Sequence, residues 1–186
     1  MDNTDDKKWT ILSSEYLSRE PWFTVRRDHV KLPNGNEIPN YYVYEYPNWV
    51  CTLAITKENK FLLIRQYRHG LGKTSMELCA GVCDKDDASP LISAQRELLE
   101  ETGYGNGNWK EIMTTSANPG THTNTTYCYL ATDVEKISEQ HLEPSEDITV
   151  FLLSLDELKE VLLKDEIRQS MHVAVIWKYL ATNHLM

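Results

Sequence analysis

The stretch Glu77–Tyr104, ELCAGVCDKDDASPLISAQRELLEETGY, decides the interpretation of the whole chain. Ser89 occupies a favourable N-cap position for a helix, and Pro90 follows it at the first helical position. Gly103 lies where many helices end in a left-handed residue. The pattern therefore predicts one helix over residues 90–102, preceded by an acidic loop.

The predicted helix places three carboxylates on one face. At about 100° per residue, Glu97, Glu100 and Glu101 fall within about 100° of one another. Like charges repel, and the C-terminal half of a helix disfavours negative charge. Two interpretations follow: a solvated acidic face, or a site for a cation that reverses the repulsion. Hard divalent ions such as Mg²⁺ take oxygen ligands, usually carboxylates together with substrate phosphates.

The same residues carry a resemblance to a known family. Residues 96–104, RELLEETGY, match the second half of the Nudix box, REUXEEXGU, where U is a bulky apolar or aromatic residue. Residues 77–81, ELCAG, resemble the ELPAG segment that leads into the box in the nucleotide-sugar pyrophosphatases of that family. The chain thus resembles a metal-dependent hydrolase.

The resemblance implies roles for the residues that match the box. Arg96 would orient the glutamates, and Glu101 would stand at the catalytic centre. The implied ion is Mg²⁺, with Mn²⁺ as the alternative. Its ligands would be Glu97, Glu100, Glu101 and the Ala80 carbonyl.

The first half of the box departs from the family pattern. The segment between Gly81 and Arg96 is one residue longer than in the family, and the Glu expected within it is absent. We interpret this difference as an insertion in the loop before Ser89. Asp86 or Asp87 is then a shorter substitute for the missing Glu.

Composition and charge exclude several classes of partner. The chain has 186 residues, ordinary proportions of hydrophobic and charged residues, a net charge of -9 and an isoelectric point near 5.1. Such an acidic chain is not expected to bind nucleic acid or an anionic membrane. A phosphate-bearing small molecule is compatible with it, because bound Mg²⁺ inverts the local field.

The cysteines and the apolar segments indicate a cytoplasmic location. The four cysteines include no CxxC pair, which argues against zinc and favours buried, reduced thiols. The sequence shows no signal peptide and no apolar run long enough to span a bilayer. We therefore expect a cytoplasmic protein.

Residues 1–48 are predicted to form a small antiparallel β unit. Residues 23–32 and 38–46 are rich in β-forming side chains, with a PNGN turn signal between them. In the ADP-ribose pyrophosphatase branch of the Nudix family, a unit of this size mediates dimerisation and contributes to nucleotide binding across the subunit boundary. The resemblance therefore implies a homodimer, with Trp22 and Trp49 as candidates for stacking on the base. The alternative is that these aromatic residues belong to the core or to an interface.

Residues 49–186 alternate strands and helices, which predicts an α+β fold. The resemblance implies the Nudix α/β/α sandwich for this part, preceded by the antiparallel β unit. Arg68 lies in an RQYR run similar to one in the nucleotide-sugar enzymes, and is the candidate for binding substrate phosphate. The pattern predicts strands over 50–55, 61–67, 111–117, 125–131 and 148–153, and helices over 155–163 and 167–180.

The loop at residues 118–124 bears on the substrate. Pro119 lies sixteen residues beyond Gly103, an offset that resembles the proline position of ADP-ribose pyrophosphatases. Many such enzymes place a Glu shortly after this Pro-Gly, where the present chain has Thr-His-Thr-Asn. His122 is a candidate contact for a phosphate or sugar hydroxyl, and an ordinary exposed histidine is the alternative.

A second acidic segment, residues 143–147, precedes the last predicted strand. As a solvated loop it needs no special explanation. In the ADP-ribose branch, however, a mobile acidic loop at this point supplies the general base or an additional metal contact. Glu146 best matches that role, followed by Glu143. Closure over substrate would desolvate the carboxylate and bring it to the attacking water.

The resemblance favours one reaction, the Mg²⁺-dependent hydrolysis of a nucleoside diphosphate linked to another group. The favoured substrate is ADP-ribose, with AMP and ribose 5-phosphate as products. One alternative is another nucleotide sugar such as GDP-mannose, because the loop after Pro119 departs from the ADP-ribose pattern. The other alternative is a catalytically weak Nudix-fold nucleotide sensor, favoured by the insertion and by the missing Glu of the box.

Overall fold

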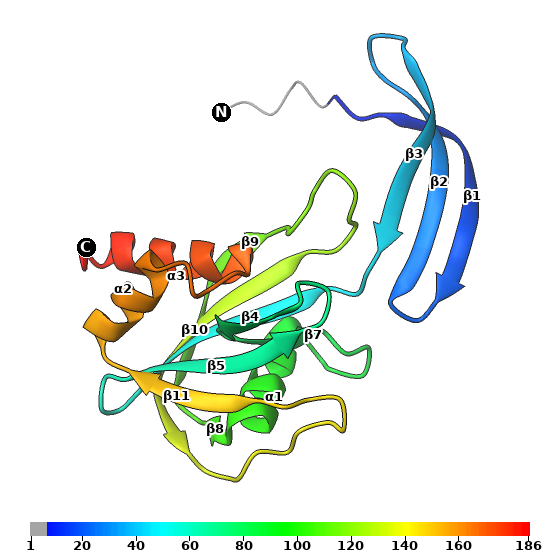
Figure 1. The fold of residues 1–186 in the computed structure, drawn as a ribbon. Helices are drawn as coiled ribbons and strands as arrows, with labels where there is room; N and C mark the ends of the chain where they lie inside the picture. Colours follow the sequence, from blue (N-terminus) through cyan, green and yellow to red (C-terminus); the bar gives the residue numbers. More distant parts are fainter. Residues whose placement is uncertain (1–6) are drawn as a thin grey trace. The chain divides into compact units, whose positions relative to one another are not determined.

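The computed structural model describes residues 7–186, which fall into two compact units (Figure 1). The first unit contains the described residues up to Tyr46 together with the loop Asn118–Asn124. The second unit contains Pro47–Ala117 and Thr125–Met186. The loop that contains Pro119 therefore packs with the first unit, although in the sequence it lies between two segments of the second unit.

The first unit is a three-stranded antiparallel sheet in the order β1-β2-β3. The strands expected at 23–32 and 38–46 are confirmed within one residue at their ends, but the strand before them was not delimited from the sequence. Two bulges in its pairing with β2 break the alternation that marks a strand in sequence. The three strands are β1 (Thr10–Glu20), β2 (Phe23–Lys31) and β3 (Glu37–Glu45).

The second unit is built on an eight-stranded sheet in the order β11-β5-β4-β10-β8. The short strands β6, β7 and β9 pair with β5, β4 and β10 respectively. All pairs are antiparallel except that of β10 with β4. The strands are β4 (Trp49–Thr56), β5 (Phe61–Arg68), β6 (Lys73–Glu77), β7 (Cys79–Val82), β8 (Tyr104–Gly105), β9 (Asn108–Thr115), β10 (Thr126–Lys136) and β11 (Thr149–Leu153).

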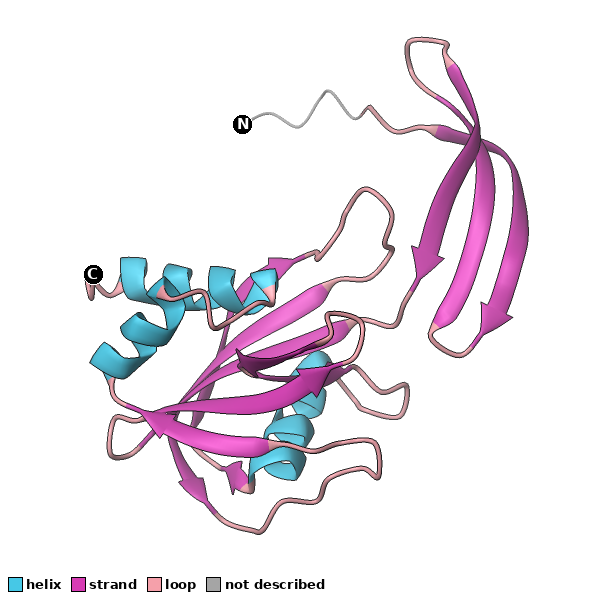
Figure 2. Ribbon diagram, in the orientation of Figure 1, coloured by secondary structure: helices cyan, strands magenta, loops and turns pink. Residues whose placement is uncertain are grey.

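Helices cover both faces of this sheet, which confirms the expected α+β sandwich (Figure 2). The central strands are apolar on both sides, as a doubly covered sheet requires. Leu53 and Leu63 belong to the core shared with α2 and α3, whereas Leu62 and Ile64 belong to the core shared with α1. The helices are α1 (Pro90–Thr102), α2 (Leu155–Leu163) and α3 (Ser170–Thr182).

Helix α1 begins and ends where the sequence predicts. The Ser89 hydroxyl accepts a hydrogen bond from Ile92 N at 3.4 Å, and Pro90 opens the helix. Gly103 closes it with φ of 75°, and its N–H donates to Leu99 O at 2.8 Å. A Cβ at position 103 would also lie 2.2 Å from the backbone oxygen of Ser138, which follows β10. Glycine is therefore favoured here both by the positive φ and by the close approach of this backbone.

The helix expected from residue 167 begins three residues later. Ile167 forms a parallel bridge with Met76, and Arg168 N donates to Ser75 Oγ at 3.2 Å. These contacts keep the chain extended beside β6 until Ser170. Within residues 7–186 no helix has the length and apolar character needed to cross a bilayer.

Candidate active site

The ELCAG segment brings the backbone of β7 against helix α1. A Cβ at position 81 would lie 2.1 Å from the Glu97 carboxyl carbon, so only glycine lets this side chain approach the strand. One residue earlier, Ala80 N donates to Glu101 Oε2 at 3.2 Å. The predicted neighbourhood of Ala80, Glu97 and Glu101 is thus formed by direct contact.

The three glutamates of α1 differ in their exposure. Glu101 is 3% exposed, and the side chains of Glu97 and Glu100 are 14% and 42% exposed. Burial, with a smaller contribution from the nearby Glu97 charge, raises the pKa of Glu101 to about 8. Burial also raises the pKa of Glu97, although Arg96 opposes this effect. The acidic face is therefore a partly buried cluster rather than a solvated surface.

Arg96 is the cation that organises this cluster. Its Nη1 lies 3.0 Å from Glu97 Oε1 and 2.9 Å from Glu100 Oε2. Its Nη2 donates to Asp87 Oδ2 at 3.1 Å and to Val82 O at 3.2 Å. The longer loop thus folds so that Asp87, one of the two predicted substitutes for the missing Glu, contacts the arginine of the box.

The acidic loop approaches the same cluster. The Glu146 charge raises the pKa of both Glu97 and Glu101, after the larger effect of burial. The Glu146 carboxylate is held by its own loop, where Oε2 accepts from Glu143 N at 2.9 Å. Glu146 N in turn donates to Glu143 O at 2.9 Å. Glu146 therefore lies within electrostatic range of the α1 glutamates while it is bonded back to its own turn.

Arg68 has a partner that the sequence did not reveal. Its Nε and Nη2 donate to the two carboxylate oxygens of Glu77, at 2.9 Å and 2.6 Å. Glu77 is 2% exposed, whereas 46% of the Arg68 side chain is accessible. Because a planar guanidinium suits a carboxylate in this two-bond arrangement, Glu77 fixes Arg68 at the end of β5. Glu77 is the first residue of the ELCAG segment, which is the feature of the sequence that could have identified it as the partner of Arg68.

His172 is a second residue that the sequence did not single out. It lies in the apolar α3 sequence, and its Nδ1 accepts a hydrogen bond from Leu78 N at 3.3 Å. Burial, together with the smaller effect of the Arg68 charge, lowers the pKa of His172 to about 3. The imidazole is therefore neutral, and it fixes the backbone between β6 and β7.

The remaining predicted residues lie elsewhere. Trp49 is half-buried at the start of β4, where its backbone N–H donates to Thr125 O at 2.9 Å. Trp22 and His122 belong to the first unit. Trp22 is 65% exposed and occupies the β1–β2 turn with φ of 60°. The second unit thus gathers Ala80, Arg68, Arg96, Glu97, Glu100, Glu101 and Glu146.

His122 and its loop are attached to β3 within the first unit. Tyr44 N donates to Thr121 O at 2.8 Å, and Thr123 N donates to Tyr44 O at 3.1 Å. The His122 ring lies 5.8 Å from the Tyr44 ring and 5.1 Å from the Tyr46 ring, between centroids. An aromatic environment therefore surrounds the predicted contact residue.

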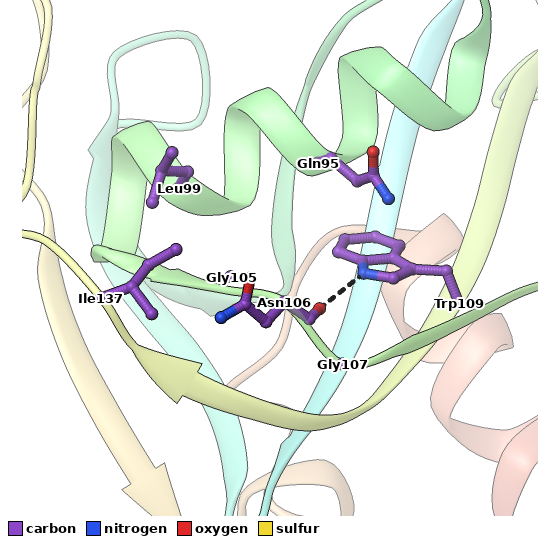
Figure 3. A pocket seen from close by; sticks show the side chains of 7 residues that line it. All are labelled: Gln95, Leu99, Gly105, Asn106, Gly107, Trp109 and Ile137. Atoms are coloured by element: carbon purple, nitrogen blue, oxygen red, sulfur yellow. Dashed lines mark hydrogen bonds between the residues drawn. The ribbon is translucent and has the colours of Figure 1, made fainter.

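A cavity of about 260 Å³ lies on the other side of α1 (Figure 3). Gln95 and Leu99 line it from the helix, and Trp109 and Ile137 line it from the chain opposite. Residues two apart on a helix point about 160° away from each other. Gln95 and Leu99 therefore face away from Glu97, and no glutamate of α1 lines this cavity, which is separate from their site.

Comparison with known proteins decides the family. Residues 46–174 match the model of the NUDIX domain, and residues 9–44 match the model of the nucleoside diphosphate sugar hydrolase N-terminal domain. The chain belongs to the Nudix family. It is a Nudix pyrophosphatase of the ADP-ribose and nucleotide-sugar branch, as the resemblance implied.

Two relatives illustrate this branch, and one solved structure shares the fold. The ADP-ribose pyrophosphatase of Mycobacterium tuberculosis is 32% identical over 165 residues, covering 88% of this chain and 79% of the relative. The GDP-mannose pyrophosphatase of Escherichia coli K12 is 31% identical over 187 residues, covering 95% and 94%. A crystal structure of an ADP compounds hydrolase has a TM-score of 0.80 at 23% identity over 97% of this chain and 98% of that one, which shows a shared fold.

Nudix hydrolases generally need divalent metal ions, and the donor set of this member fits one. As the side chains stand, no three acidic, imidazole or thiol groups within residues 7–186 converge on one point, and Arg96 pairs with both Glu97 and Glu100. The carboxylates are nevertheless hard oxygen donors gathered beside a backbone carbonyl strand. The raised pKa of Glu101 also indicates a buried site at which a bound cation would favour the charged carboxylate.

Proposed function

We propose that this Nudix pyrophosphatase hydrolyses ADP-ribose to AMP and ribose 5-phosphate, with Mg²⁺ as its ion and Mn²⁺ as the alternative. The observation that carries the proposal is the buried carboxylate cluster, in which Glu101 contacts Ala80 N and Glu97 packs against Gly81. The relative from Mycobacterium tuberculosis supports ADP-ribose as the substrate. The proline at position 119 supports the same choice.

Different residues of the site would bind the ion, hold the substrate phosphate and accept the proton. Glu97, Glu100 and Glu101, with the Ala80 carbonyl, would hold the ion. When bound, the ion would polarise the diphosphate and lower the pKa of the attacking water. Arg96 keeps two of the glutamates in place through its ion pairs, and the accessible part of Arg68 is available to substrate phosphate. Glu146 would take the proton of the water after exchanging its bond with Glu143 N.

We also propose distinct roles for the two parts of the chain, residues 1–48 and 49–186. The second part carries the hydrolase site, and the first provides the homodimer contact and part of the nucleotide site. Large apolar side chains exposed on β1, on the β1–β2 turn and at the start of β2 support the dimer. They include Ile11, Leu12, Leu17, Trp22 and Phe23. A clean monomer in light scattering would remove both the dimer and a role for Trp22 across subunits.

Contacts to the base and the sugar follow from the same proposal. The exposed Trp22 indole would stack on the base, and Trp49 is the other candidate for that contact. His122 would contact a phosphate or a sugar hydroxyl. We place the enzyme in the cytoplasm, where its free cysteines would stay reduced.

GDP-mannose is the second candidate substrate, and a specific observation favours it. The relative from Escherichia coli matches this chain over 95% of its length, and the loop after Pro119 lacks the Glu of the ADP-ribose pattern. Kinetic comparison of ADP-ribose, GDP-mannose and UDP-glucose in Mg²⁺, with products separated by chromatography, decides between them. The highest kcat/KM for ADP-ribose, with AMP as product, supports the proposal. A higher kcat/KM for GDP-mannose would make GDP-mannose the substrate. Binding of these nucleotides without turnover would favour a catalytically weak nucleotide sensor.

A further inference from the structure

The chain that follows β10 closes the C-terminal end of α1. The last carbonyls of a helix have no partner inside it. Here Ser138 N donates to Gly103 O at 3.1 Å, and His141 N donates to Glu100 O at 2.8 Å. The chain leading to the acidic loop is therefore attached to the helical turn that carries two of the glutamates.

The Gln140 side chain connects the end of α1 to the segment just before β11. Its Nε2 donates to Glu101 O at 2.6 Å and to Ile148 O at 3.3 Å. A primary amide has two N–H donors, so one side chain can serve both carbonyls. Ile148 is buried and directly precedes β11. Gln140 thus joins the two ends of the loop 141–147 to each other and to α1.

Apart from these bonds, the loop is attached through Leu142, which packs against the core on the α1 side of the sheet. His141, Glu143, Pro144, Ser145 and Asp147 are all exposed. The turn inside the loop is closed by hydrogen bonds between Glu143 and Glu146, which leave its distance from α1 undetermined. That distance depends on how the two ends of the loop are held. Local segments with few buried contacts open independently of the global fold, so the loss of the two Gln140 bonds at the base of the loop should change how often the loop opens.

We propose that Gln140 is the positioning residue that holds the acidic loop, and with it Glu146, beside the glutamate-bearing end of α1. Gln140 does not touch the substrate and acts through Glu146. The inference rests on the proposed function, because it takes Glu146 as the general base of the hydrolysis.

Gln140→Met removes both donors and keeps the length of the side chain. Gln95→Met is the matched control, because Gln95 lies on the opposite side of α1 and lines the separate cavity (Figure 3). Amide hydrogen exchange should be about tenfold faster or more over residues 141–147 in the Gln140 variant, with the helix interior unchanged. The Gln95 variant should match the wild type. Wild-type exchange rates in the loop of the Gln140 variant would overturn the inference.

A double-mutant cycle separates positioning from a merely structural role. With ADP-ribose and Mg²⁺, Gln140→Met should lower kcat about tenfold and leave KM within about twofold. In a Glu146→Gln background the same substitution should lower kcat no further, because the residue it positions is already lost. Multiplicative losses would show that Gln140 acts independently of Glu146.

The two readouts also separate this inference from the proposed function. Absence of turnover by the wild type would remove the proposed function, and hydrogen exchange would still decide whether Gln140 holds the loop. Normal wild-type turnover with unchanged loop exchange would remove the inference alone.

Discussion

Helix α1 and the loop 141–147 both present carboxylates to the candidate site, but they are built in opposite ways. Helix α1 is capped at both ends, and Leu98 and Ala94 pack into the cores that it shares with the sheet. It holds Glu101 almost fully buried. The loop is mostly exposed, and its Glu146 is bonded to its own backbone. Metal ligands benefit from a rigid support, whereas a base that acts on closure needs a segment able to move.

Glu101→Gln removes the rigid member of this pair and should have the largest effect. AMP formation from ADP-ribose should fall by at least about 10³-fold, because a buried carboxylate ligand is lost. The free energy of unfolding should not fall at pH 7, since burial already disfavours the charged form of this residue. Steady-state rates and urea unfolding measure the two. A rate within about threefold of wild type contradicts the assignment, and Glu160→Gln on the exposed part of α2 is the control.

Glu146→Gln removes the loop-borne member of this pair and should have the next largest effect. The value of kcat should fall about 10²-fold, the usual contribution of a general base. The free energy of unfolding should stay within about 0.5 kcal/mol of wild type, because the Glu146 side chain bonds to its own turn and is not part of the core. Glu139→Gln, at a nearby side chain that is 88% exposed, should leave kcat unchanged. Equal losses of kcat in the two variants would contradict the assignment of Glu146 as the general base.

Gly81→Ala tests how closely α1 must approach β7. The added Cβ would lie 2.1 Å from the Glu97 carboxyl carbon, so this side chain must move away from the strand. We expect a fall in kcat of about tenfold, because a displacement of about 1 Å at a site is costly. Gly70→Ala is the matched control, since its Cβ meets nothing within 4 Å. Similar kinetics for both variants would show that the close approach is dispensable.

The sequence was sufficient where local signals decide the structure. Ser89, Pro90 and Gly103 determine the ends of α1, and the spacing of Glu97 and Glu101 determines their shared face. The helix α2 was predicted to the residue, because its apolar spacing and capping box are local as well.

Long-range partners were not predictable in the same way. The ion pair of Arg68 with Glu77 depends on how β5 and β6 pair. His172 lies in an apolar helix sequence, where its bond to a distant backbone N–H leaves no pattern. Gln140 binds two backbone carbonyls, which exist at every position of any chain. The attachment of the loop 118–124 to β3 is equally non-local.

His172 gives the smallest predicted effect, on stability rather than rate. Its folded-state pKa of about 3 lies below the ordinary value of 6.5, so the folded protein binds fewer protons than the unfolded chain between these values. Its contribution to stability is therefore lost as pH falls through this window. Between pH 8 and pH 5 the wild type should lose about 2 kcal/mol more than His172→Asn, which keeps a hydrogen-bond acceptor. Urea unfolding at both pH values measures this difference, and equal losses would contradict it.

The central claim is that the glutamates of α1 hold the divalent ion, while the loop acts on the substrate without holding it. Mn²⁺ binding, followed by electron paramagnetic resonance without substrate, tests this claim most directly. The account predicts that the wild type and Glu146→Gln bind Mn²⁺ with affinities within about twofold of each other, and that Glu101→Gln weakens binding by about tenfold or more. Undiminished binding by Glu101→Gln, or an equal loss in Glu146→Gln, would contradict it.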